Sequence, residues 1–135
     1  MQLKNARILL TGASGGLGQE LAIQLTAAGA TLLLAGRDQS RLTTLTASLG
    51  AGAASVCADL ERPAGVAALA AAGREFGVNV LINNAGVGAF GLFENQDWPT
   101  VARLLATNLE APIHLTHALL PWLKAQPQAA IVNIG

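Results

Sequence analysis

Short apolar runs alternate along the chain with longer segments in which apolar residues recur every three or four positions. The runs lie at residues 6–10, 31–35, 53–57, 78–82 and 129–134. Runs of this length predict buried strands, and the spacing of Leu17, Leu21 and Leu25 after the first run predicts a helix. Strands that alternate with helices favour a parallel sheet, so the pattern predicts an α/β fold.

The predicted helices begin and end at residues that suit these positions. Gly29 ends the first helix, Asp38 or Ser40 can cap the second, Pro63 suits the first turn of the third, and Asp97 caps the fourth. No linker or low-complexity tract divides them, so we expect one domain over residues 1–135. Because crossovers between parallel strands are nearly always right-handed, five such strands most simply give a doubly wound sheet in the order 3-2-1-4-5. A binding crevice is then expected at the carboxyl ends of strands 1 and 4.

A glycine-rich segment, Thr11-Gly-Ala-Ser-Gly-Gly-Leu-Gly18, joins the first strand to the first helix. Gly12 can adopt backbone angles closed to other residues, while Gly16 and Gly18 keep side chains away where a backbone approaches a pyrophosphate or packs on a strand. The unpaired amides and positive dipole end of a helix that begins near Gly16 would face the phosphates. This context favours a nucleotide site, and a flexible turn is the alternative interpretation.

Composition narrows the choice of partners and location. Eight basic and eight acidic residues give zero net charge, and no basic stripe points to nucleic acid. No run of 18 apolar residues predicts a membrane span, and the first residues lack the features of a signal peptide. With Cys57 as the single cysteine there is no internal disulfide. We therefore expect a cytoplasmic protein that binds neither nucleic acid nor a membrane.

Five motifs in order resemble the N-terminal, cofactor-binding half of a short-chain dehydrogenase/reductase. They are the TGxxxGxG pattern at residues 11–18, Asp59-Leu60, Asn83-Asn-Ala-Gly86, Asn108 within Asn-Leu-Glu-Ala-Pro112, and Ile131-Val-Asn-Ile-Gly135. The resemblance implies a Rossmann-like fold and an NAD(P)-dependent oxidoreductase that acts on an alcohol or carbonyl compound. It further implies that Gly12, Ser14, Gly16, Leu17 and Gly18 surround the pyrophosphate, that Asp59 and Leu60 contact the adenine, and that Asn83, Ala85 and Gly86 line the cofactor cleft.

The end of the second strand bears on the choice of dinucleotide. An acidic residue there binds the ribose 2'-hydroxyl of NAD, whereas a nearby arginine accommodates the 2'-phosphate of NADP. Gly36 stands where the acid is expected, and Arg37 follows it. The sequence therefore favours NADP(H), with NAD(H) possible as well. Two alternatives remain open, that Asp38 neutralises Arg37 and that Arg37 is a solvated loop charge.

Asn108 is the candidate catalytic residue. Val101, Leu104, Leu105 and Asn108 follow helical spacing, which predicts that Asn108 is buried on the apolar face. Pro112 has no amide hydrogen to donate to the Asn108 carbonyl, which is left free for a water. The resemblance implies that this water is linked to a catalytic lysine, and a kinked helix with a satisfied asparagine is the alternative. His114 and His117 have no ligand partners at metal-binding spacing, so we predict no metal site.

The 135 residues do not contain all the catalytic residues that the family uses. The resemblance requires a serine beyond the fifth strand and a Tyr-x-x-x-Lys pair, and the chain contains no tyrosine. We therefore expect a truncated chain that is inactive on its own and self-associates through the apolar edge at Ile131, Val132 and Ile134. A non-catalytic nucleotide-binding or interaction module is the alternative. An epimerase or dehydratase is a third hypothesis, which the motif spacing disfavours.

Overall fold

A single parallel sheet forms the centre of the molecule in the computed structural model, which describes residues 1–135. Its five strands stand in the order β3-β2-β1-β4-β5, as predicted. They are β1 (Arg7–Thr11), β2 (Thr31–Gly36), β3 (Ala53–Cys57), β4 (Val80–Asn83) and β5 (Ala130–Asn133). Every neighbouring pair is parallel, so the carboxyl ends of all strands lie at one edge of the sheet.

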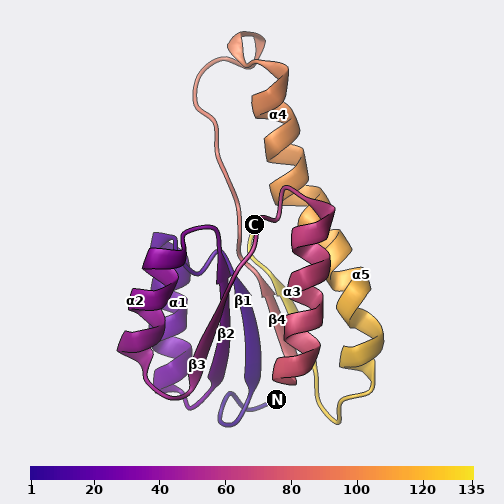
Figure 1. The fold of residues 1–135 in the computed structure, drawn as a ribbon. Coiled ribbons are helices and arrows are strands. Elements are labelled where there is room, and N and C mark those ends of the chain that lie inside the picture. The colour runs from indigo at the N-terminus through magenta and orange to yellow at the C-terminus, as the bar shows by residue number, and fades with distance from the viewer.

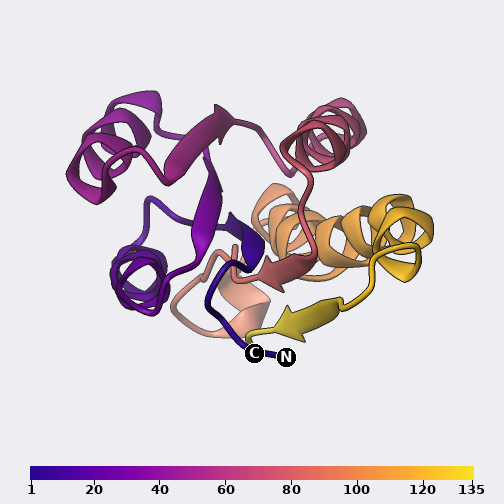
Figure 2. The same ribbon diagram turned by 90° about the horizontal axis from the view of Figure 1, so that it is seen from below.

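Helices cover both faces of the sheet (Figures 1 and 2). Helices α1 (Gly16–Ala27) and α2 (Gln39–Leu49) lie on one face, and α3 (Pro63–Phe76) and α5 (Ala111–Lys124) lie on the other. A short 3-10 turn, η1 (Phe93–Asn95), precedes α4 (Trp98–Leu105), which continues through a π-helical turn, η2 (Ala106–Glu110), into α5. Figure 1 shows α4 projecting beyond the carboxyl edge of the sheet. This arrangement leaves the ends of β1 and β4 open on that edge.

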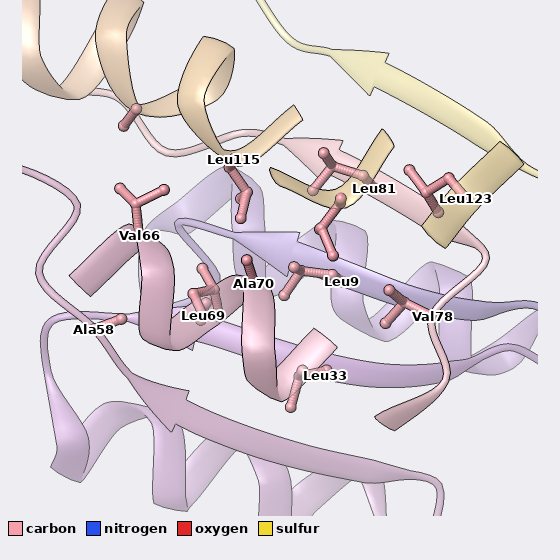
Figure 3. Close-up of a cluster of buried hydrophobic side chains, with 13 residues drawn as sticks. Leu9, Leu33, Ala58, Val66, Leu69, Ala70, Val78, Leu81, Leu115 and Leu123 are labelled. Carbon is pink, nitrogen blue, oxygen red and sulfur yellow. The ribbon is translucent and has the colours of Figure 1, made fainter. Parts of the chain in front are cut away.

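Alternate residues of the strands face the two helical layers. Leu9 and Leu33 belong to one buried cluster with residues of α3 and α5, whereas Ile8 and Leu32 belong to a second cluster with residues of α1 and α2. Figure 3 shows the first cluster, in which Leu9, Leu33 and Leu81 meet side chains from both helices. Burial on both faces explains why the strands read as continuous apolar runs. A sheet packed in this way fixes the positions of the loops at its carboxyl edge.

The helix ends agree with the sequence. Asp38, rather than Ser40, caps α2 and accepts a hydrogen bond from the Arg41 amide at 3.0 Å. Asp97 caps α4 by accepting one from the Thr100 amide at 2.9 Å. Hydrogen bonding by the Thr100 side chain, and to a smaller extent by the Thr100 amide, lowers the pKa of Asp97 below its ordinary value of 3.8. The carboxylate therefore stays charged at the positive end of α4.

The bounds of β3 are those predicted, and the bounds of the other four strands differ from the predicted ones by one or two residues. The largest difference is at β4, which begins at Val80 rather than residue 78. The Val78 amide donates to the Gly73 carbonyl at 3.1 Å, so Val78 completes the end of α3 instead of entering the sheet. Gly77, at φ 77°, makes the reversal between the two elements. No helix of the chain is long and apolar enough to cross a membrane.

Candidate functional site

A cleft of about 510 Å³ opens at the carboxyl edge of the sheet, between the ends of β1 and β4. Its size lies within the range of cofactor and small-molecule sites. The strand ends and loops that line it contribute Gly12, Ser14, Gly15, Gly16, Leu17, Gly18, Gly36, Arg37, Asp38, Arg41, Ala58, Leu60, Glu61, Asn84, Ala85, Gly86 and Val87, and Thr107 and Ile134 complete it. The crevice thus lies where the strand order predicts it.

Two glycines of the segment from Thr11 to Gly18 are required by the backbone. Gly12 has a φ of +67°, and a Cβ there would lie 2.7 Å from the Ala85 Cα. A Cβ on Gly18 would lie 2.1 Å from the Gly12 carbonyl oxygen. Gly16 differs, because a Cβ there meets no atom within 4 Å. Gly12 and Gly18 let the turn close, and Gly16 leaves the mouth of the turn open for a ligand.

The amino end of α1 lies on the wall of this cleft. Its N-cap, Gly15, supplies no side-chain hydrogen bond, and the first turn carries no acidic residue. The amides at this end are therefore free of any side-chain acceptor, and the helix dipole adds a partial positive charge. Gly15, Gly16 and Leu17 are exposed there. Such an end fits a phosphate group.

Thr11 joins the two strand ends that flank the cleft. Its buried hydroxyl accepts hydrogen bonds from the amides of Asn84 and Ala85, both at 3.0 Å, and donates to the Ile82 carbonyl at 3.4 Å. The Asn84 side chain donates in return to the Thr11 carbonyl at 3.1 Å. These bonds hold the segment after β4 against the glycine segment.

Two of the predicted cofactor residues do not line the cleft. Asn83 is buried, and its side-chain Nδ2 donates to the Asn133 Oδ1 at 2.8 Å and to the Thr116 hydroxyl at 3.3 Å. Asp59 accepts from the Glu61 amide at 3.0 Å and pairs with Arg62 at 3.3 Å. Both side chains support the segments that form the wall, whereas their neighbours in sequence, Asn84 and Leu60, face the cleft.

Basic side chains flank the end of β2. Arg37 and Arg41 both line the cleft, and the Arg37 Nη1 lies 2.9 Å from the Glu61 Oε1. Asp38 pairs instead with Arg41 at 3.5 Å, so the structure does not support Asp38 as the partner of Arg37. A Cβ on Gly36 would lie 2.7 Å from the Ser14 hydroxyl oxygen, so a side chain at this position requires that hydroxyl to rotate away.

The prediction that Asn108 is buried on an apolar helix face is wrong, because the structure places it in an exposed position. The reason is the π-helical turn, in which the Ala111 amide donates to the Ala106 carbonyl. Such a turn contains one residue more than a regular turn, so the 3.6-residue spacing no longer identifies the buried face. Thr107 is the buried residue of the turn.

Asn108 holds the loop after β4 to this turn. Its Oδ1 accepts from the Val87 amide and its Nδ2 donates to the Val87 carbonyl, each at 2.8 Å. Val87 lines the cleft. The side chain therefore positions one wall of the cleft, and its proposed water-binding carbonyl stays a prediction.

The sequence motifs did not identify several of the lining residues, among them three with polar side chains. Arg41, Glu61 and Thr107 all face the cleft, and the Thr107 hydroxyl is buried without a hydrogen-bond partner. A buried hydroxyl ordinarily has a partner, so a ligand or water is expected there. Pro112, close to Thr107 in sequence, was the one available signal of an irregular helix.

The strand order, the glycine segment after β1 and the crevice at the switch point define a Rossmann-like doubly wound domain. The family model described as short chain dehydrogenase matches residues 6–135, and the chain belongs to this family.

Individual relatives agree with this membership. Dehydrogenase/reductase SDR family member 7B from Bos taurus is 37% identical in an alignment 144 residues long. The alignment covers 98% of this chain and 44% of that protein. A metagenomic short-chain oxidoreductase solved in complex with NADP is 34% identical with a TM-score of 0.90, covering 98% of this chain and 63% of that one. A relative from Burkholderia phymatum, solved in complex with NAD, is 33% identical with a TM-score of 0.90, covering 98% and 50%. The chain spans about half the length of the curated relatives it matches.

Proposed function

We propose that this chain is the cofactor-binding part of an NADP(H)-dependent short-chain oxidoreductase that acts on an alcohol or carbonyl compound. The observation that carries the proposal is the pair of arginines, Arg37 and Arg41, on the cleft wall beside a glycine in place of the usual acid. The solved relatives with NADP and with NAD support a dinucleotide, and NAD(H) remains an alternative ligand. A bound nicotinamide would supply or accept the hydride.

The lining residues fit the parts of a dinucleotide. Gly12, Ser14, Gly16, Leu17 and Gly18 would surround the pyrophosphate at the amino end of α1. Leu60 would contact the adenine, and Ala85 and Gly86 would form the opposite wall. Arg37 would bind the 2'-phosphate. Asp59, Asn83 and Asn108 would act indirectly, because their side chains hold wall segments in place.

Replacing Arg37 by alanine is expected to weaken NADPH binding by about 10- to 100-fold, the usual range for a lost charge-assisted hydrogen bond. The loss also leaves the Glu61 carboxylate unpaired beside the phosphate. NADH binding should change by less than about threefold, because it has no phosphate at this position. Calorimetric titration of both dinucleotides measures the two effects.

Arg103→Ala is the matched control, since Arg103 lies in the last turn of α4 and does not line the cleft. Equal losses for NADPH and NADH in Arg37→Ala, or an equal loss of NADPH binding in Arg103→Ala, would contradict the assignment of Arg37.

The chain as given is expected to show no carbonyl reduction above background. Proton transfer to the substrate needs a group with a suitable pKa within hydrogen-bond reach, and the 135 residues include no tyrosine to serve. Incubation with NADPH and a panel of aldehydes and ketones, followed by absorbance of the reduced nicotinamide, tests this. Saturable turnover by the purified chain would refute it. A cytoplasmic location and self-association stay predictions.

A further inference from the structure

Glu61 places a carboxylate on the cleft wall, in contact with the arginine to which the proposed function assigns the 2'-phosphate. The Arg37 Nη1 and the Glu61 Oε1 are 2.9 Å apart, and the Glu61 side chain is 29% exposed against 55% for Arg37. The two residues are 24 positions apart in sequence and meet because β2 and β3 pair in parallel, with Gly36 opposite Cys57. An anion that approaches Arg37 must therefore also approach Glu61.

Both members of this pair have fixed backbones. The Ala58 amide donates to the Gly36 carbonyl at 2.9 Å, and the Cys57 thiol donates to the Arg37 carbonyl at 3.4 Å. On the other side, the Glu61 amide donates to Asp59 at 3.0 Å. Glu61 is thus a positioned acid on the wall.

The other acids near this corner are already engaged. Asp38 caps α2 and pairs with Arg41, and Asp59 holds the Glu61 amide and pairs with Arg62. Gly36 contributes no carboxylate at the end of β2, where a dinucleotide fold ordinarily carries the acceptor for the ribose 2'-hydroxyl. Glu61 lines the cleft and pairs with Arg37 through its Oε1, so its Oε2 is available to fill that role from the β3 side.

We propose that Glu61 sets the selectivity between the two dinucleotides, by accepting the ribose 2'-hydroxyl of NAD(H) and opposing the 2'-phosphate of NADP(H). Arg37 leaves Glu61 for the phosphate when NADP(H) binds and stays paired with Glu61 when NAD(H) binds. The site would accordingly accept both ligands, with a smaller preference for NADP(H) than Arg37 alone would give. This inference rests on the proposed function, since it concerns the same cleft.

Removing the Glu61 charge is expected to change the binding of NADPH and of NADH in opposite directions. An exposed ion pair contributes little by itself, so the loss of its hold on Arg37 is small, whereas repulsion between a carboxylate and a phosphate is removed altogether. In Glu61→Gln we expect NADPH to bind about fivefold tighter and NADH about twofold weaker, a change of roughly tenfold in the ratio of the two Kd values. The change should shrink as salt is added, because the charges are partly exposed.

The experiment is calorimetric titration of the 135-residue chain with NADPH and with NADH at low ionic strength. Glu75→Gln is the matched control, because Glu75 is exposed on α3 and does not line the cleft. Glu61→Asp keeps the charge and is expected to retain a ratio within about threefold of the wild type. In the double variant R37A/E61Q, NADPH should bind tighter than in R37A, because no unpaired carboxylate remains.

The outcomes distinguish the inference from the function on which it rests. If the wild type binds neither dinucleotide, the proposed function and the inference both fail. If it binds at least one dinucleotide and Glu61→Gln leaves each measurable Kd within twofold of the wild type, or Glu75→Gln shifts these values equally, only the role of Glu61 is overturned. A rise of Kd(NADH)/Kd(NADPH) in Glu61→Gln that is absent in both Glu61→Asp and Glu75→Gln supports the role of Glu61.

Discussion

Replacing Gly18 by alanine is expected to destabilise the chain by about 3 kcal/mol and to weaken NADPH binding at least about tenfold. The added methyl would lie 2.1 Å from the Gly12 carbonyl oxygen and 2.8 Å from the Ala13 Cα. Both neighbours are backbone atoms, so relief requires the turn itself to move. Because the turn and the amino end of α1 form the proposed phosphate site, the loss of stability and the loss of binding have one cause.

Gly16→Ala supplies the matched control for this prediction. The same methyl meets no atom within 4 Å at position 16, which begins α1. Alanine favours a helix over glycine by up to about 1 kcal/mol, so the variant should be as stable as the wild type or more so. NADPH binding should still weaken, because the methyl stands in the proposed phosphate site. Urea unfolding and calorimetry test both variants, and a Gly18→Ala chain as stable as Gly16→Ala would contradict the account of the turn.

Replacing Thr11 by valine is expected to cost about 2–5 kcal/mol of unfolding free energy. Valine has nearly the same volume, so the core stays filled, but the amides of Asn84 and Ala85 lose their acceptor at 3.0 Å. The hydroxyl is buried, at 2% exposure for the residue, so water does not readily replace it. NADPH binding should fall in parallel, since these amides fix the wall opposite the glycine segment.

Thr11→Ser keeps the hydroxyl and removes one methyl. Its expected cost is about 1 kcal/mol, the usual value for a buried carbon of this size. Urea unfolding monitored by circular dichroism gives both free energies. Equal destabilisation by serine and valine would show that the methyl, rather than the hydrogen bonds, matters at this position.

The sheet was predictable from sequence because each strand appears as an apolar run, and a general rule on crossover handedness sets the strand order. Apolar runs such as residues 31–35 identify strands buried on both faces, and right-handed crossovers leave few orders for five of them. The start of β4 was missed by two residues, because the apolar Val78 bonds to the end of α3. The apolar side chain of Val78 indicates that the residue is buried, but it does not show whether the residue belongs to a strand or to a helix end.

The candidate site was predictable only in part. The glycine segment has requirements that appear in the sequence, namely positive φ at Gly12 and close backbone contact at Gly18. The partner of Arg37 has no such signal, because Asp38 is adjacent in sequence whereas Glu61 arrives through the pairing of β2 with β3. Asn108 was misplaced because a π-helical turn breaks the period on which its burial was predicted.

Calorimetric titration of the unmodified 135-residue chain with NADPH, with adenosine 2',5'-bisphosphate and with 5'-AMP tests the central claim most directly. We expect saturable binding of NADPH at one site per chain, and we expect the bisphosphate to displace NADPH more effectively than the monophosphate does. No binding of NADPH, or equal displacement by the two adenosine phosphates, would contradict the assignment of this cleft to NADP(H).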